Sequence, residues 1–147
     1  MAKLQLRILT ADEIKVDEPV DMIIMRCLLE DMGKKSAMGE IGILPGHVPL
    51  TGVLGINPLR IFDQGEERII ALFGGIVTVR DDLVTLMTEK ALWPDEIEED
   101  RARLAFTEAE REIEAMGDTN LRTNQIAMRR ALVQIEVSTY PLVGRKR

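Results

Sequence analysis

A single histidine is the side chain in this sequence best suited to acid–base chemistry at neutral pH. His47 stands in the run Pro45-Gly46-His47-Val48-Pro49, and the chain contains no other histidine. A catalytic site also needs a nucleophile and a group that stabilises developing charge. No serine or cysteine stands at a motif position beside His47, and its ring can instead cap the backbone of its own loop. These residues predict a protein without catalytic residues.

Two further features invite a chemical interpretation, and each has a simpler structural one. Cys27 lies in the apolar run 22–29, so we expect a buried, free thiol in a reducing compartment. One cysteine and one histidine cannot build a zinc site of the usual kind, and we expect no metal. Gly74-Gly75 lacks the flanking residues of a phosphate-binding loop. Because it lies between apolar stretches, it predicts a bend where two backbones approach closely.

The composition limits the classes of partner. The 147 residues fit one domain, or a small domain with an appendage. An aromatic content of 3% and a net charge of −6 argue against nucleic-acid binding. The longest apolar stretch, 69–79, is too short to cross a bilayer as a helix, and the amino terminus lacks the apolar centre of a signal peptide. We expect a soluble, cytoplasmic chain with no nucleic-acid partner and no direct membrane insertion.

Short apolar runs separated by turn residues occupy positions 1–92. Apolar and polar residues alternate from position 4 to 8, as in a strand with one buried face. The run 22–29 is apolar throughout and predicts a buried strand, with a short helix as the alternative. Asn57-Pro58 indicates a turn or a sheet edge, whereas Asp63–Glu66 and Asp81-Asp82 predict hairpin turns. This spacing is typical of a β-sandwich or a flattened barrel.

One stretch of this region has the density of breakers expected of a shaped loop. Gly39 to Leu50 contains three glycines and two prolines within twelve residues. No helix tolerates this density, and proline is confined to the edges and bulges of a sheet. We therefore expect a loop between short extended pieces. It is either a plain connection between sheets or a binding loop on a rigid scaffold.

From Trp93-Pro94 onward the periodicity becomes helical, so we place a second domain at residues 93–147. Asp95 with Glu98 resembles a capping box, Gly117 is placed as a C-cap, and Pro141 ends the pattern. The expected apolar stripes are Ala102, Ala105, Phe106, Ala109, Ile113 and Met116 in the first helix, and Leu121, Met128, Ala131, Leu132 and Ile135 in the second. Two amphipathic helices joined by a tight turn predict an antiparallel hairpin.

Charge divides between the two predicted helices. Residues 95–117 carry nine acidic side chains against three arginines, whereas residues 118–147 carry six basic side chains against two acids. In one interpretation the two helices simply complement each other. In another, the basic second helix and tail engage an acidic partner through Arg122, Arg129 and Arg130. A third is that the basic tail binds anionic lipid.

The run G-E-I-G-I-L-P-G-H-V-P-L closely resembles the signature of the epsilon subunit of bacterial rotary (F-type) ATP synthases. Further matches in the family's order are Gly74–Val79, Val84–Thr88 and the pair of helices. The resemblance implies a sandwich of about ten strands followed by a helical hairpin. It implies a non-catalytic regulatory subunit of the central stalk, held peripherally at the cytoplasmic face of the bacterial cell membrane.

The resemblance also implies partners. Members of the family couple the gamma subunit to the c-ring during proton-driven ATP synthesis, and their helices inhibit ATP hydrolysis by reaching the alpha and beta subunits. Carried onto this chain, Glu40, Ile41 and Gly42 would face the c-ring. Pro45, Gly46 and His47 would belong to the same contact loop, with His47 near gamma. The alternative is a free-standing β-sandwich adaptor that binds a protein or peptide through its loops.

Two departures from the family pattern bear on function. The segment around Glu30 to Met38 is longer than in compact members, and we expect it to lengthen a hairpin or loop beside the partner surfaces. The family's ATP-binding element, [IL]-D-x-x-R-A, corresponds here to Ile97–Ala102, with Glu98 in place of aspartate. Arg101 and Arg130 match the basic positions of nucleotide-binding members, but a further one is Gln134. We expect no obligate cofactor, and ATP only as a weak regulatory ligand.

Overall fold

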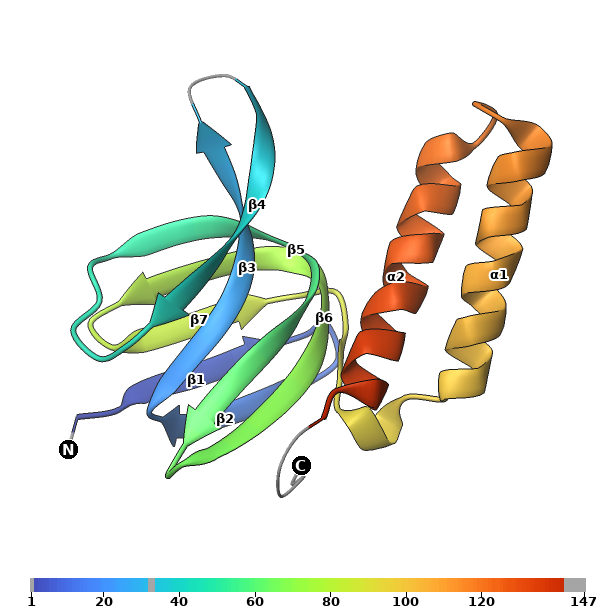
Figure 1. Cartoon of the computed structure of the whole chain (residues 1–147). Helices are drawn as coiled ribbons and strands as arrows, with labels where there is room; N and C mark the ends of the chain where they lie inside the picture. Colours follow the sequence, from blue (N-terminus) through green and yellow to red (C-terminus); the bar gives the residue numbers. More distant parts are fainter. Residues whose placement is uncertain (1, 32–33, 142–147) are drawn as a thin grey trace.

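The structure, a computed structural model, describes residues 2–31 and 34–141, which form a β-sandwich followed by two antiparallel helices (Figure 1). The strands are β1 (Leu4–Leu9), β2 (Ile14–Val20), β3 (Met22–Asp31), β4 (Lys34–Ile43), β5 (Leu50–Asp63), β6 (Glu66–Arg80), β7 (Leu83–Met87) and β8 (Ala91–Leu92). A short 3-10 helix, η1 (Pro94–Glu96), leads to α1 (Glu99–Met116) and α2 (Leu121–Thr139). The predicted fold class is confirmed.

The strands are ordered β2-β1-β7-β6-β5-β3-β4, and β8 pairs with β6. β1 and β7 run parallel, and the other pairs of this sheet are antiparallel. β5 and β6 contain 14 and 15 residues and curve around the core together (Figure 1). Because each long strand serves both layers of the sandwich, the described residues form eight strands rather than about ten.

The centre of the sandwich is aliphatic. Leu4, Leu6 and Ile8 have no exposed surface, which confirms the alternation expected for β1. Cys27 is buried in the same cluster, and the alternative of a short helix at its run is wrong because β3 is a continuous strand. Trp93 closes this cluster from the end of β8, under the guanidinium of Arg68 at 5.4 Å from the ring centre. The low aromatic content is therefore compatible with a well-filled core.

The expected loop at Gly39–Leu50 is shorter in the structure. Gly39 to Ile43 belong to β4, which pairs with β3 at the end of the sheet, and only Leu44 to Pro49 are outside strands. The prolines do not forbid this strand, because both lie beyond its end. Pro58 lies inside β5. On the side of β5 that faces β3, the pairing is interrupted between Leu54 and Arg60. The interrupted ladder leaves room for a residue without an N–H donor.

Gly75 allows the closest backbone approach in the sandwich. Its φ is +128°, and a Cβ atom added there would lie 1.9 Å from the carbonyl oxygen of Met87. Gly74 also has a positive φ, of +77°. The bend predicted at the glycine pair is confirmed. Its cause is that the segment after β7 continues close alongside β6, where any side chain at Gly75 would collide with the backbone of Met87 and Thr88.

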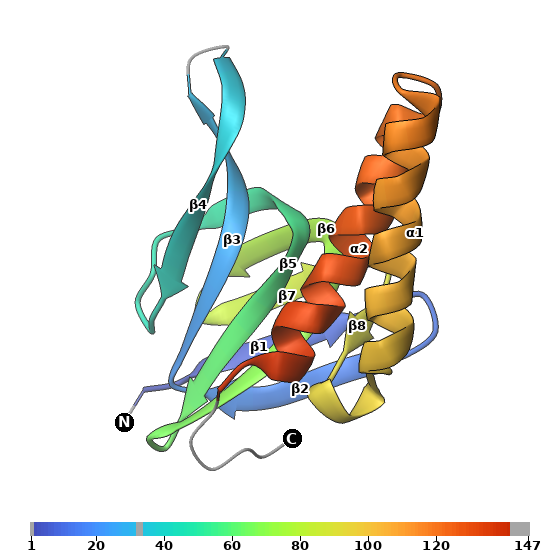
Figure 2. The same cartoon turned by 45° about the vertical axis from the view of Figure 1, so that its right-hand side comes forward.

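The hairpin of β3 and β4 extends beyond its neighbours (Figures 1 and 2). β3 pairs with β4 out to Asp31 and Lys34, whereas its pairing with β5 stops at Leu28. The longer segment around 30–38 therefore lengthens a hairpin, as expected, although residues 32–33 at its tip lie outside the described residues.

Helix α2 lies between α1 and the sandwich (Figure 2). Its buried side chains face both neighbours, and those against the sandwich, Val133 and Val137, were absent from the expected stripe. Ala105 and Met116 of the α1 stripe are exposed.

The capping box predicted at Asp95 and Glu98 is also wrong: Glu96 accepts the Trp93 N–H at 3.0 Å, and α1 begins at Glu99. Proline after Trp93 favours this extra turn.

Candidate partner-binding surfaces

The loop that carries His47 is fixed by its own hydrogen bonds. The N–H of Gly46, at φ +85°, donates to the carboxylate of Asp82 in the β6–β7 turn at 2.7 Å. The N–H of His47 donates to the Leu44 carbonyl at 3.1 Å. His47 Nδ1 lies 2.7 Å from the Val48 carbonyl oxygen, so this contact needs the proton on Nδ1. The imidazole therefore caps its own loop, and Pro45 lies half-buried beside it.

Residues Glu40, Ile41 and Gly42 lie on β4, the strand at the end of the sheet. Glu40 is exposed, and its carboxylate is 3.9 Å from Arg26 on β3. Ile41 packs partly against the core, and Gly42 is exposed, with no atom near the place of a Cβ. The end of β4 thus presents an acidic side chain and a bare stretch of backbone, which allows another chain to approach closely.

An apolar row crosses an outer face of the sandwich on five neighbouring strands. Direct cross-strand neighbours place Val53 beside Ile76, Ile76 beside Met87, Met87 beside Leu9, and Leu9 beside Ile14. The exposed fractions are 52% for Val53, 45% for Ile76, 47% for Met87 and 65% for Ile14, while Leu9 is half-buried. Five neighbouring strands span about 19 Å. Scattered apolar side chains are ordinary on a surface, but a contiguous row marks an interaction site.

The row and the His47 loop belong to one continuous surface. Between them lies a shallow hollow of about 690 Å³ with threonines from three adjacent strands along its floor, namely Thr51, Thr78 and Thr85. Pro49, at the end of the loop, also lines this hollow. Sequence analysis missed the row because its members are far apart along the chain. The detectable signal is a large apolar residue at an outward position of each of five strands.

The three arginines of α2 have different surroundings. Arg122 is exposed near the start of the helix. Arg129 donates to the side-chain oxygen of Asn57 on β5, and Arg130 lies 3.3 Å from Glu89. Among the described residues, none of the ion pairs joins α1 to α2. Close ion pairs therefore do not join the basic helix to the acidic one in the described residues, because Arg129 and Arg130 contact the sandwich.

The two residues considered for ATP are not brought together. Arg101 is exposed, lies 3.5 Å from Glu98 and lines a pocket of about 390 Å³ between the helices and β8. Gln134 and Lys90 line the same pocket, whereas Arg130 is engaged by Glu89. The pocket thus offers two cations, but Glu96 and Glu98 also line it. These carboxylates would oppose a polyphosphate.

Few titratable groups have altered chemistry. Burial raises the pKa of the Cys27 thiol, which keeps it protonated, and burial lowers the pKa of Arg68, whose guanidinium lies over the Trp93 ring. Within residues 2–31 and 34–141, no three His, Cys, Asp or Glu side chains gather closely enough to bind a metal ion. No helix in the described chain is both long and apolar enough to cross a bilayer.

Comparison with known protein families identifies the family of this chain. The family model for the β-sandwich domain of the ATP synthase delta/epsilon chain matches residues 3–94, and the model for its long α-helix domain matches residues 95–139. The chain belongs to the ATP synthase delta/epsilon family. Together the two models span almost the whole sequence, so the family accounts for both the sandwich and the helices.

Relatives of this family agree along their full length. The ATP synthase epsilon chain of Bacillus pumilus is 31% identical over 138 residues, covering 94% of this chain and 98% of its own. That of Bacillus licheniformis is 31% identical over 139 residues, covering 94% and 99%. They support an epsilon subunit of an F-type ATP synthase, as the signature predicts.

Solved structures share the fold of this epsilon-family chain. A chain in the Euglena gracilis mitochondrial ATP synthase (OSCP/F1/c-ring) superposes with a TM-score of 0.76 at 22% identity, covering 95% of this chain and 83% of that one. A chain from the central stalk and c-ring of the Tetrahymena thermophila mitochondrial enzyme gives a TM-score of 0.51 at 16% identity, covering 68% and 73%.

Proposed function

We propose that this chain couples the gamma subunit to the c-ring in the central stalk of a bacterial F-type ATP synthase, and that its helices inhibit ATP hydrolysis. It contributes no catalytic residue and lies peripherally at the cytoplasmic face of the membrane. The full-length match to epsilon chains supports the complex. The observation that carries the coupling role is the apolar row beside a rigid loop, since a subunit without chemistry must act through contacts.

The gamma subunit is assigned to the face that bears the apolar row. The helices cover another part of the sandwich, where Val133 and Val137 bury part of β6, and the row stays exposed. The hollow continues this face to Pro49, in the loop that carries His47, the residue that the family resemblance places near gamma. The end of β4, with Glu40, Ile41 and Gly42, is assigned to the polar loops of the c-ring.

A substitution pair tests the gamma assignment. Val53→Thr with Ile76→Thr keeps β-branched side chains on β5 and β6 while removing apolar surface. Affinity for purified gamma, measured by biolayer interferometry, should fall about tenfold or more, since each buried methyl group stabilises an interface by about 0.8 kcal/mol. The matched control is Leu104→Gln, because Leu104 is exposed on α1, away from this face.

The outcomes separate two questions. Parent-like affinity in the double variant would place the gamma site elsewhere, whereas failure of the unmodified chain to bind gamma would refute the central-stalk proposal. Inhibition is tested in the assembled enzyme with a chain that ends after Ile97. Its ATP hydrolysis rate should exceed that of the full-length assembly, because the arm proposed to reach alpha and beta is missing. Equal rates would remove the inhibitory role.

ATP is proposed only as a weak regulatory ligand of the pocket beside Arg101. Glu98 is one methylene longer than the aspartate of the family element, and Gln134 supplies no positive charge for phosphate. Arg130 is already held by Glu89. Isothermal titration of the full-length chain with ATP should give at most weak binding. Tight binding that is lost in Arg130→Ala would contradict this proposal.

A further inference from the structure

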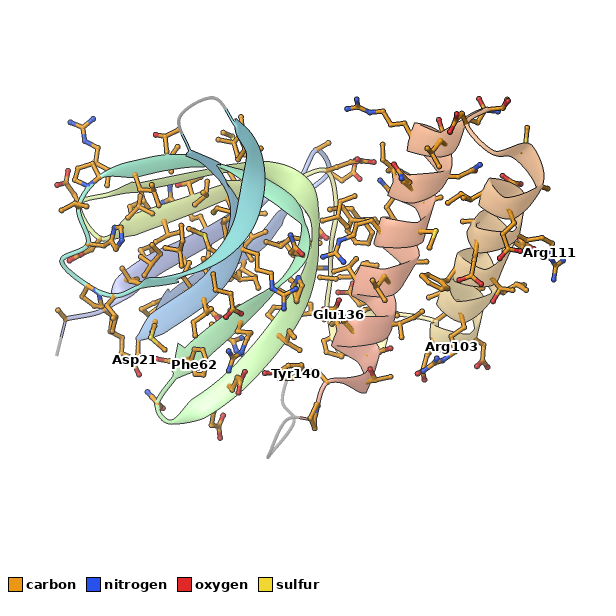
Figure 3. All side chains as sticks on the ribbon, turned by 45° about the horizontal axis from the view of Figure 1, so that its top comes forward. Asp21, Phe62, Arg103, Arg111, Glu136 and Tyr140 are labelled. Carbon is orange, nitrogen blue, oxygen red and sulfur yellow. The ribbon has the colours of Figure 1, made fainter. Side chains whose placement is uncertain are left out.

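The helical pair is attached to the sandwich through one helix and a small apolar contact. Val133 and Val137 of α2 pack with Ile69, Ala71 and Phe73 of β6. Within the described residues, α1 contributes to neither apolar cluster of the structure. Figure 3 shows Glu136 of α2, and Tyr140 directly after this helix, on the side facing the sheet, and Arg111 of α1 projecting away from it. Polar contacts between α2 and the sandwich add to this apolar cluster in holding the helical pair in place.

The first polar contact joins Arg130 to the turn between β7 and β8. Its guanidinium lies 3.3 Å from both carboxylate oxygens of Glu89 and 5.0 Å from the centre of the Phe73 ring. The side chains are 34% exposed for Arg130 and 67% for Glu89, so solvent screens the pair. A screened ion pair stabilises the docked helix only weakly, so undocking of α2 costs little free energy at this contact.

The turn that carries Glu89 is rigid. The N–H of Phe73 donates to the Lys90 carbonyl at 3.1 Å and to the Thr88 hydroxyl at 3.2 Å. Gly75 lets this segment lie directly on β6, because a Cβ there would overlap Met87. The carboxylate is thus presented at a fixed place on the sandwich, whether or not α2 is there to meet it.

The second polar contact lies one residue earlier on α2. Arg129 donates to the side-chain oxygen of Asn57, which is 3% exposed on β5. The Arg129 guanidinium is also 3.9 Å from Glu136, which lies 4.0 Å from Arg26 on β3. The acceptor on the sandwich is here a buried neutral amide. Undocking of α2 therefore leaves no unpaired carboxylate at this contact.

We propose that Arg130 with Glu89, and Arg129 with Asn57, form a polar latch that sets the fraction of molecules whose helical pair is docked on the sandwich. The latch is reversible because its partners are screened or neutral, and because the apolar contact beneath it is small. Docking is a property of the single chain. Its consequence for ATP hydrolysis rests on the proposed function, since a released pair of helices is the one free to reach a partner.

The test measures the distance between the helices and the sandwich in the full-length chain. Spin labels are placed on Glu112→Cys in α1 and Arg80→Cys in β6, both exposed, in a Cys27→Ala background. Pulsed electron resonance then gives the docked and undocked fractions. Arg130→Glu and Glu89→Arg should each raise the ratio of undocked to docked molecules about three- to tenfold. Arg122→Glu makes the same charge change on α2 away from the latch and should leave the ratio unchanged.

The exchange Arg130→Glu with Glu89→Arg should restore most of the docked fraction, since the pair is re-formed with its charges reversed. Single reversals that act no more strongly than Arg122→Glu, or a double variant no better docked than either single one, would overturn the latch. Binding of gamma by the same variants is measured in parallel. A failed latch with normal gamma binding leaves the proposed function intact, whereas failure of the unmodified chain to bind gamma counts against that function alone.

Discussion

Replacement of Gly75 by alanine should destabilise the sandwich more than any other glycine-to-alanine change among the glycines with described surroundings. A Cβ atom at this position would lie 1.9 Å from the Met87 carbonyl oxygen and 2.9 Å from Thr88 Cα. Both are backbone atoms, so no side chain can rotate away. The strand β6 and the segment after β7 must separate to accommodate the methyl group.

The magnitude follows from the contacts that separation would break. The Phe73 N–H loses its two acceptors on Thr88 and Lys90, at about 1 kcal/mol for each hydrogen bond. Alanine at φ +128° adds backbone strain of about 1–3 kcal/mol. The sum, about 3–5 kcal/mol, lowers the melting temperature of a domain of this size by about 15–30 °C.

Thermal unfolding followed by circular dichroism measures the effect, and Gly65→Ala is the matched control. Gly65 also has a positive φ, of +76°, but no atom lies near the place of its Cβ. The Gly65→Ala protein should be destabilised only by its left-handed backbone conformation, by about 1–2 kcal/mol. A Gly75→Ala protein that melts within a few degrees of the Gly65→Ala protein would refute the argument that close backbone approach requires this glycine.

Three further outcomes are expected. The N–H of Gln64, with Lys3, holds the pKa of Asp21 below its ordinary value, so its stabilising contribution is present above about pH 4 and is lost as pH falls through the lowered pKa. Urea unfolding between pH 7 and pH 3 should therefore show a shallower loss of stability in Asp21→Asn than in the parent, and equal slopes would contradict this. The chain ending after Ile97 should fold with a lower melting temperature and bind more of a hydrophobic dye, because it uncovers the part of β6 under α2; unchanged dye binding would show that this surface stays covered. Glu98→Asp combined with Gln134→Arg should tighten ATP binding about tenfold in isothermal titration, and no change would remove the pocket as the ATP site.

The sequence predicted those parts of the fold that depend on neighbours along the chain. The alternation in β1, the hairpin turns at Gln64-Gly65 and Asp81-Asp82, and the bend at Gly75 are local features, and each is present. The turns have positive φ at both central residues, which suits the right-handed twist of the strands. Such features can be read from residue type alone.

The contact surfaces depend on partners that only the fold brings together. The apolar row joins residues from five strands, and its register is set by pairings such as Leu9 with Met87. The charge split of the helices was equally clear in the sequence, but it did not show that Arg130 would meet Glu89. A periodic apolar stripe predicts one buried face of a helix, whereas α2 has two buried faces, one against α1 and one against the sandwich.

The parallel pairing of β1 with β7 has a consequence for the order in which the protein forms during synthesis. Leu6 pairs with Val84, so β1, which is synthesised before the other strands of the sandwich, must wait for one of the last of them. Translation proceeds at about 5–20 residues per second, which leaves β1 and β2 without their sheet for about 4–17 s. The hairpin of β5 and β6 is local and can form in that interval. The amino-terminal strands would then dock onto it as a preformed template, and until they do, the side chains of Leu4, Leu6 and Ile8 are open to chaperones.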